Sequence, residues 1–216
     1  MAISFYYSSG SPFAWRVYLA LEHKGIDYEL KNISLSAEEH LEPAYLAVNP
    51  RHKVPAIVDG DLNLYESPVI LEYLEDKYPD APALYPVDIK QKAIVRRIIH
   101  EVDSYLWPPA FDMAKQIFFK SDPNEWDQNA IDTGKQGVLE EFGIFEKMFT
   151  GNYLVGELSA ADLTLYPFIT FMQRLKIKNP DLIFDDAMGP NLTAWKKRIE
   201  SLPYYDKTYP PHWKQK

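Results

Sequence analysis

The sequence of 216 residues contains no cysteine. Disulfide bonds, thiolate zinc sites and a cysteine nucleophile are therefore excluded, and the composition is consistent with a reducing compartment. The sequence also lacks any run of about eighteen apolar residues, which a membrane-spanning helix would need. Its first residues, Met-Ala-Ile-Ser, carry neither the basic segment nor the long apolar stretch of a secretory signal. We therefore expect no membrane span and a cytoplasmic location.

Positive charge is scarce, particularly in the N-terminal part of the chain. The formal net charge is -8. Residues 1–80 contain 6 Lys and Arg against 13 Asp and Glu, whereas the remaining residues contain 17 against 18. An acidic chain without a basic stripe is poorly suited to nucleic acids or anionic membranes, so neither is expected as a partner. Arg16, Arg51 and Lys53 are among the few N-terminal cations and are candidate anion ligands.

The first 80 residues predict a small α/β domain from their alternating and helical patterns. The predicted elements are a strand at 3–5, a helix ending before Gly25, a strand at 28–33, a helix capped by Ser36, a hairpin of strands at 54–58 and 62–64, and a helix beginning at Glu66-Ser67-Pro68. Pro55 is anomalous inside a strand because it cannot donate to a ladder. It therefore marks an edge, a bulge or a cis peptide bond.

The rest of the chain predicts helices only. Three prolines between residues 79 and 86 indicate a linker. The expected helices cover about 89–119, 127–149, 159–175 and 192–201, with a kink at Pro108-Pro109. We therefore expect a β-α-β-α-β-β-α domain at residues 1–78, a linker at 79–87 and an all-helical domain at 88–216.

The turn from Ser8 to Ser11 lies between the first strand and the first helix. Ser11 followed by Pro12 is typical of an N-cap and a first-turn proline. The positive end of a helix dipole, beside free backbone N–H groups, favours an anion, including a thiolate. On this stretch alone, helix capping is the more ordinary role for Ser11.

Four motifs occur in order along the chain and together resemble those of the cytosolic glutathione transferases. They are Ser11-Pro-Phe-Ala-Trp-Arg16-Val running on to Glu29, Asn49-Pro-Arg-His-Lys-Val-Pro55, Glu66-Ser67 leading into Ile70-Leu-Glu-Tyr-Leu74, and Ser159-Ala-Ala-Asp162. The resemblance covers essentially the whole chain. It implies a thioredoxin-like domain followed by a helical domain, and glutathione as co-substrate without a metal site.

The resemblance also implies which residues hold glutathione. Pro55, if cis, would leave the backbone of Val54 free to pair with the peptide. Ser67 would take the γ-glutamyl carboxylate at a helix N-terminus, and Glu66 would take the amine. His52 and Lys53 would face the glycyl carboxylate. Pro68 departs from many delta-like members, which have an arginine there, so one γ-glutamyl contact is in doubt.

The residue that activates the thiol is open between Ser11 and Ser9, with Tyr7 ranked third. Ser11 matches the serine of tau-like members, five residues before Arg16, whereas Ser9, three residues before Pro12, resembles the serine that precedes a proline in delta and theta members. The tyrosines lie too far from Arg16 for the tyrosine-type pattern. Arg16 either approaches glutathione or is structural, and we favour the structural role.

The remaining assignments concern the helical part and the assembly. Ser159 and Asp162 are expected to form a capping box rather than a substrate site. A homodimer and an apolar electrophile are implied by the family. The main prediction is a glutathione transferase of a detoxifying kind. The alternatives are an isomerase, etherase or reductase on the same scaffold, or a non-catalytic glutathione-binding protein. Candidate electrophile contacts are aromatic residues, namely Phe13, Tyr105, Trp107, Phe111 and Trp213.

Overall fold

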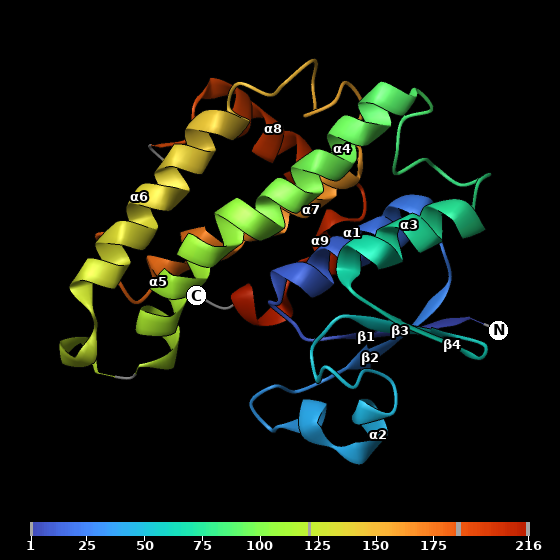
Figure 1. Cartoon of the computed structure of the whole chain (residues 1–216), viewed down its shortest axis with the longest axis horizontal. Coiled ribbons are helices and arrows are strands. Elements are labelled where there is room, and N and C mark those ends of the chain that lie inside the picture. The colour runs from blue at the N-terminus through green and yellow to red at the C-terminus, as the bar shows by residue number, and fades with distance from the viewer. Residues whose placement is uncertain (1, 121, 185–186, 215–216) are drawn as a thin grey trace. The chain divides into compact units, whose positions relative to one another are not determined.

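The computed structural model describes residues 2–120, 122–184 and 187–214. Contacts divide the chain into two compact units (Figure 1). The first unit comprises the chain up to Pro86 together with the tail from Leu202 onward, and the second comprises Val87–Ser201. Within the described ranges, no helix is both long enough and apolar enough to cross a membrane.

The first unit is built on a sheet of four strands in the order β2-β1-β3-β4. β1 pairs with β2 in parallel, whereas β3 runs antiparallel to both β1 and β4. Helices α1 and α3 pack together above the sheet, and α2 lies below it (Figure 1). The bounds are β1 Ile3–Tyr7, α1 Pro12–Lys24, β2 Tyr28–Asn32, α2 Pro43–Leu46, β3 Ala56–Asp59, β4 Leu62–Tyr65 and α3 Ser67–Lys77. The expected thioredoxin-like order is confirmed.

Helix α1 has the ends that its sequence predicts. Ser11 is the N-cap, and Pro12 occupies the first turn. Gly25 ends the helix with φ at 63°, in the left-handed region that glycine enters at least cost. Apart from Phe13, Glu22 and His23, the helix is buried all round, because both the sheet and the tail pack against it.

One local prediction in the first unit is wrong, and one strand begins two residues later than expected. The helix expected to begin at Ser36 does not form. Instead a turn leads to a 3₁₀ segment at Glu39–Leu41 and then to α2. The Glu39 carboxylate accepts the Ser34 N–H at 2.7 Å, which stabilises the turn in place of a helix start. Pro55 precedes β3 rather than lying inside it, so no ladder hydrogen bond is lost.

The second unit is helical, and its bounds are α4 Ile89–Glu101, α5 Trp107–Phe119, α6 Gln128–Phe145, α7 Ala160–Leu175 and α8 Pro190–Glu200. A π-helical segment at Val102–Leu106 separates α4 from α5, so the first long helix is interrupted just before the prolines rather than at them. Helix α7 is buried along most of its length and begins at the expected capping box of Ser159 and Asp162. There the Asp162 carboxylate accepts Ser159 N–H at 2.9 Å.

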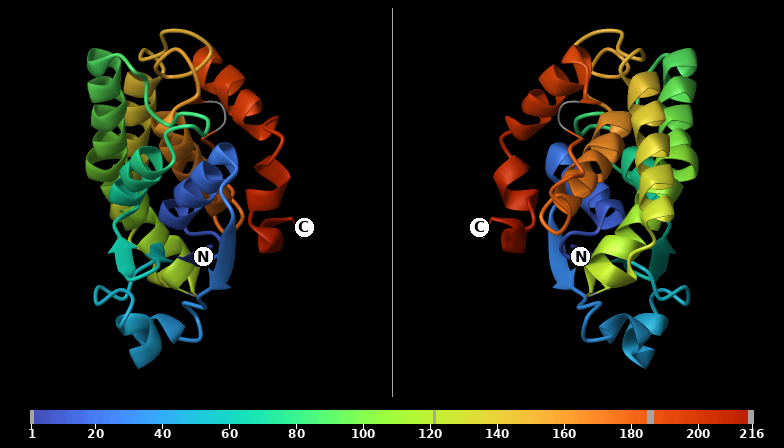
Figure 2. Two further views of the ribbon diagram at one scale, coloured as in Figure 1. Left: turned by 90° about the vertical axis from the view of Figure 1, so that its right-hand side faces the viewer. Right: turned by 90° about the vertical axis from the view of Figure 1, so that its left-hand side faces the viewer.

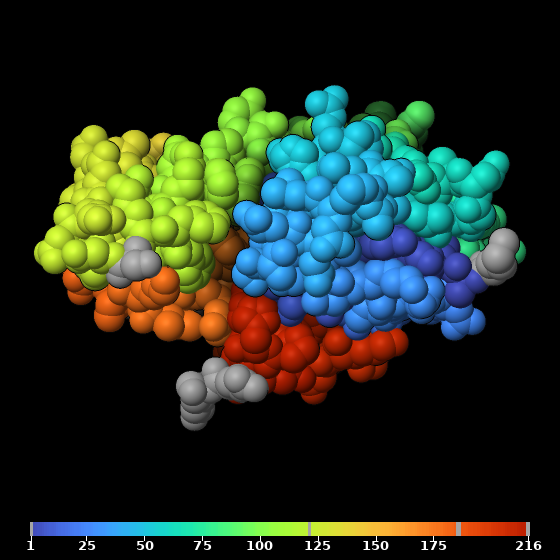
Figure 3. Space-filling view, turned by 90° about the horizontal axis from the view of Figure 1, so that it is seen from below, coloured from blue at the N-terminus to red at the C-terminus, as the bar shows by residue number. Residues whose placement is uncertain are grey.

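The tail packs with the first unit rather than with the helices that precede it. Helix α9, Tyr205–Thr208, lies along α1, and Figure 2 shows the two side by side. Figure 3 shows the red tail against the blue N-terminal residues. The indole of Trp15 donates to Thr208 Oγ1 at 3.1 Å and packs edge-on against Trp213. The tail therefore covers Trp15, whereas the sequence placed all of 88–216 in the helical domain.

Candidate functional site at one edge of the sheet

The strand register brings three predicted motifs to the same edge of the sheet. Ala56 of β3 lies opposite Tyr6 of β1 and opposite Tyr65 of β4. Because β3 is antiparallel to both neighbours, the C-terminal ends of β1 and β4 meet its N-terminal end. The Ser8–Ser11 turn, the Val54–Pro55 segment and the start of α3 therefore lie next to one another.

The turn after β1 is closed by backbone and side-chain hydrogen bonds of Ser11. The Ser11 N–H donates to Ser8 C=O at 3.1 Å, and Ser11 Oγ accepts the Ala14 N–H at 3.4 Å. The first turn of α1 holds no acidic residue, so the positive end of the helix is not neutralised there. Capping uses a lone pair of the hydroxyl, which leaves its proton free to donate to another group.

Ser9 is held by the tail. Its hydroxyl hydrogen-bonds His212 Nδ1 at 3.1 Å. Gly10 has φ at 90°, and a Cβ placed there would lie 3.2 Å from side-chain atoms of both His212 and Trp213. A glycine is therefore needed for the backbone conformation and for the close approach of the tail.

The segment before β3 is shaped by a buried asparagine. The Val54–Pro55 peptide bond is cis. Asn49, which is buried, donates from Nδ2 to Lys53 C=O at 2.7 Å and accepts the Arg51 N–H at 2.9 Å. The Tyr45 hydroxyl donates to the same Lys53 carbonyl at 2.5 Å. These bonds fix the loop that carries His52 and Lys53.

His52 and Lys53 are both exposed, and His52 has φ at 47°. The backbone amide of His52 donates to Asn49 C=O at 2.9 Å. No backbone hydrogen bond to Val54 is found among the described residues. The loop thus presents a side-chain cation and a backbone edge to solvent.

The start of α3 combines a strained residue with a buried hydroxyl. Glu66 is exposed and has φ at 70°, a conformation that costs a non-glycine residue roughly 1–3 kcal/mol. Ser67, the first residue of α3, is buried, and its Oγ accepts Arg16 Nε–H at 2.8 Å. Arg16 is fully buried, and its guanidinium lies 5.0 Å from the Phe13 ring centre. Arg16 is therefore structural, as favoured, and also contacts a predicted ligand residue.

The five aromatic candidates for the electrophile fall into both units. Phe13 and Trp213 belong to the first, where Trp213 packs on Trp15 with ring centres 5.6 Å apart. In the second unit Trp107 stacks on Phe111 at 5.1 Å, whereas Tyr105 is 62% exposed. Their role in binding an electrophile stays a prediction.

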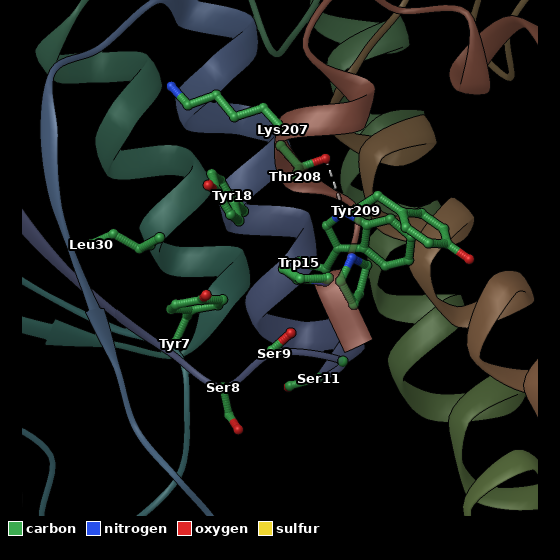
Figure 4. A pocket seen from close by; sticks show the side chains of 13 residues that line it. Tyr7, Ser8, Ser9, Ser11, Trp15, Tyr18, Leu30, Lys207, Thr208 and Tyr209 are labelled. Carbon is green, nitrogen blue, oxygen red and sulfur yellow. Dashed lines mark hydrogen bonds between the residues drawn. The ribbon is translucent and has the colours of Figure 1, made fainter. Parts of the chain in front are cut away.

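Ser9, Ser11 and Tyr7 also line a cavity of about 140 Å³ within the first unit (Figure 4). Its other walls come from α1, from Leu30 of β2 and from the tail. None of the predicted glutathione ligands from His52 to Ser67 lines it. The cavity therefore shares the Ser8–Ser11 turn with the edge where the three motifs meet, but neither of the other two motifs lines it. Among the described residues, no cluster of three or more His, Asp or Glu suited to a metal ion is found.

Three contributors to this region were missed from the sequence. Asn49 and Tyr45 organise the loop before β3, and His212 contacts the turn. The Asn49-Pro50 dipeptide indicated a loop in the sequence. It did not indicate that the Asn49 side chain would donate to the Lys53 carbonyl. His212 lies 203 residues from Ser9, so no local pattern connects them.

Comparison with known proteins agrees with the fold. The family model described as glutathione S-transferase, N-terminal domain, matches residues 10–77, and the C-terminal domain model matches residues 106–203. Glutathione S-transferase 1 of Dianthus caryophyllus is 34% identical over 172 residues, covering 76% of this chain and 74% of that protein.

A second relative, maleylacetoacetate isomerase of Mus musculus, is 31% identical over 204 residues, covering 91% of this chain and 87% of its own. The crystal structure of a glutathione S-transferase from the Antarctic clam Laternula elliptica is 30% identical, with a TM-score of 0.79, and the match covers 100% of this chain and 95% of that one. The chain belongs to the glutathione transferase family. The family membership expected from the four motifs is thereby confirmed.

Proposed function

We propose that this protein is a glutathione transferase that binds glutathione at the sheet edge and activates its thiol beside the N-terminus of α1. The observation that carries the proposal is the strand register, which aligns Tyr6, Ala56 and Tyr65. That register brings together the N-terminus of α1, the backbone of the segment before β3 and the N-terminus of α3. An extended tripeptide with a carboxylate at each end and a thiol between requires these same elements.

The γ-glutamyl end of glutathione would bind at the start of α3. The Ser67 N–H and O–H would donate to its carboxylate, where the helix dipole favours an anion. Arg16 already donates to Ser67 Oγ at 2.8 Å, so the Ser67 hydroxyl proton is directed elsewhere and is free for the ligand. The exposed Glu66 carboxylate would accept from the amine.

The remainder of the tripeptide would lie along the segment before β3. The Val54 N–H and C=O would pair with its backbone, which adds a short strand to the sheet edge. His52 and Lys53 would face the glycyl carboxylate. In a part of the chain that carries an excess of acidic residues, the positive charge of Lys53 favours a ligand that carries two carboxylates.

Ser11 is our first choice for the group that stabilises the thiolate. A free thiol has a pKa near 8.5, and lowering it by about 2 units, about 2.7 kcal/mol, makes the thiolate dominant at neutral pH. One O–H donor and an unneutralised helix N-terminus are adequate in size. Ser9 ranks second because its hydroxyl is engaged by His212, and Tyr7 ranks third.

The thiolate would then attack an electrophilic carbon held by apolar contacts, for which Phe13, Tyr105, Trp107, Phe111 and Trp213 remain the candidates. A second function on the same site is glutathione-dependent isomerisation. It is favoured by the similarity to maleylacetoacetate isomerase over 91% of the chain. A homodimer in the cytoplasm stays a prediction from composition and family.

The deciding experiment has three measurements on the purified chain. Calorimetry with glutathione should give saturable binding, and a chlorodinitrobenzene should be conjugated at a rate above the uncatalysed one. Maleylacetoacetate should be turned over faster than the chloroarene if the isomerase function is the main one. Absence of glutathione binding would exclude both activities, and binding without either turnover would favour a non-catalytic role.

A further inference from the structure

The cavity behind the Ser8–Ser11 turn is not explained by glutathione binding. It measures about 140 Å³ and lies entirely within the first unit. Figure 4 shows Tyr7, Tyr18, Leu30 and Trp15 around one hollow, with Thr208 and Tyr209 of the tail closing another side. Every wall belongs to β1, α1, β2, the turn or the tail, so a molecule bound here would not need Val54, Glu66 or Ser67.

The volume limits the occupant to a single ring. An apolar protein cavity of about 150 Å³ is known to accept benzene, and this cavity has nearly that size. Two of its walls are aromatic and already meet edge to face, since the ring centres of Tyr7 and Tyr18 lie 5.7 Å apart. A third ring inserted beside them would gain edge-to-face or offset-stacked contacts in addition to the burial of its apolar area.

The polar groups of the cavity favour an uncharged occupant. Lys207 is at its rim, but Lys207 Nζ lies 2.6 Å from Glu22 Oε1, so its charge is already balanced. The N-terminal part of the chain also has an excess of acidic residues, which would repel an anion. A carboxylate or phosphate is therefore disfavoured.

One hydroxyl is available to a ligand. Burial, with a smaller contribution from Tyr18, raises the pKa of the Tyr7 phenol, so this group stays neutral and can donate or accept. Among the described residues no hydrogen bond to the Tyr7 hydroxyl is found, and Tyr7 lines the cavity. A ring with one hydroxyl substituent satisfies both the aromatic walls and this group.

We propose that the cavity is a second ligand site, selective for a neutral phenol with a single ring. The ring lies against Tyr7, Tyr18 and Leu30, and the phenolic hydroxyl hydrogen-bonds the Tyr7 hydroxyl. This site goes beyond the proposed transferase function: it shares Tyr7, Ser9 and Ser11 with the thiol-activating turn, but no glutathione ligand from His52 to Ser67 contributes a wall.

The test uses p-cresol as the probe and two matched substitutions. Leu30 of β2 is 38% exposed and lines the cavity, so Leu30→Trp would fill it from the open side. Leu62 of β4, on the opposite edge strand, is 37% exposed and does not line it, so Leu62→Trp is the control. We expect calorimetry to give one p-cresol site in the native chain and in Leu62→Trp, and at least tenfold weaker binding in Leu30→Trp.

Tyr7→Phe tests the hydrogen bond separately from the shape. The native chain should bind p-cresol more tightly than toluene, and Tyr7→Phe should lose most of that preference while still binding toluene. Equal preference in both proteins would overturn the assignment of the hydroxyl contact. Equal p-cresol affinity in Leu30→Trp and the native chain would overturn the site.

Competition and crystallography keep the proposal testable if a variant fails to fold. Saturating S-methylglutathione should leave p-cresol binding unchanged, whereas displacement would place p-cresol with glutathione and overturn a separate site. Crystals soaked in 4-bromophenol should show the anomalous signal of bromine between Tyr18 and Leu30, and a bromine only elsewhere would contradict the proposal. Loss of glutathione binding with retained p-cresol binding would exclude the transferase and leave this site intact.

Discussion

At the scale of single residues, Ser9 and Ser11 of the Ser8–Ser11 turn have different hydrogen-bond partners. Ser11 accepts a backbone N–H and keeps its proton, whereas Ser9 is engaged by His212 of the tail. A hydroxyl that caps a helix through a lone pair can still donate its proton to a thiolate, so the two roles of Ser11 are compatible. This geometry favours Ser11 over Ser9 as the activating group.

Replacing Ser11 by alanine should therefore separate binding from activation. We expect the pKa of bound glutathione to rise by about 1–2 units and kcat/KM at neutral pH to fall about 10–100-fold, because a hydrogen bond to a charged group is lost. Glutathione affinity should change little. Ultraviolet titration of the bound thiolate gives the pKa, and Ser11→Thr should restore it. A larger loss in Ser9→Ala than in Ser11→Ala would transfer the role to Ser9.

Arg16 should affect glutathione binding rather than turnover. Its Nε–H orients the Ser67 hydroxyl, and lysine has no donor at that position on its side chain. In Arg16→Lys we expect the glutathione Kd to rise about tenfold, which corresponds to about 1.4 kcal/mol, with kcat at saturating glutathione nearly unchanged. Arg97→Lys, at an exposed arginine of α4, is the control. A fall in kcat at constant Kd would contradict a positioning role.

At the scale of elements, the start of α7 depends on one buried carboxylate. Asp162 accepts from the Ser159 and Leu154 N–H groups, the Ser159 hydroxyl and the Trp195 indole, all at 2.9 Å. Asp162→Ala leaves these buried donors without an acceptor and should lower the free energy of unfolding by more than about 3 kcal/mol. Urea unfolding measures this, and Ser159→Ala, expected to cost about 1 kcal/mol, is the comparison. A smaller loss in Asp162→Ala than in Ser159→Ala would contradict the account.

The Asp162 carboxyl also makes the free energy of unfolding depend on pH, and the sign of this dependence follows from its pKa. Burial raises the pKa of Asp162 to about 6, against hydrogen bonds that lower it. Between about pH 4 and 6 the folded state therefore binds more protons at this site than the unfolded state, so its contribution to stability falls as pH rises through that window. The stability of the native chain relative to Asp162→Asn should accordingly be greater at pH 4.5 than at pH 7. A difference that is constant, or that grows with pH, would exclude the raised pKa.

The elements also indicate how much the sequence could predict. The strand and helix order, the cap at Ser11 and the capping box at Asp162 follow from patterns a few residues long, and these predictions agree with the structure. The Ser36 helix was wrong because serine and glutamate at short spacing also suit the turn that Glu39 stabilises. The Trp15–Thr208 hydrogen bond joins residues 193 apart, and no pattern in the sequence specifies such a contact.

At the scale of the whole molecule, the chain returns to its first unit after completing the second. Thr208, Tyr209 and Trp213 of the tail cover Trp15, which is buried. Ending the chain after Ser201 would remove these contacts and expose a tryptophan of α1. The first unit is thus completed only when the last residues have been made.

Truncation after Ser201 should therefore destabilise the first unit. Loss of the packing around a buried aromatic residue typically costs about 3–5 kcal/mol, which lowers the thermal midpoint of a chain of this size by roughly 10 °C. Calorimetry gives the midpoint, and tryptophan fluorescence should shift to longer wavelength as Trp15 meets water. Trp213→Ala should give a smaller change in the same direction. An unchanged midpoint after truncation would show that the tail adds no stability.

The register of Tyr6, Ala56 and Tyr65 has a consequence for how this scaffold can change. Backbone ladders hold the three strand ends together, so the side chains of the Ser8–Ser11 turn are not needed to assemble the edge. The thiol-activating side chain can therefore be replaced without loss of the sheet edge, and substitutions in this one turn could change the reaction that the site catalyses. Since the chain has no cysteine of its own, a thiol introduced at Ser11 would be unique in the molecule and could be labelled selectively, which would make this turn an addressable position for engineering.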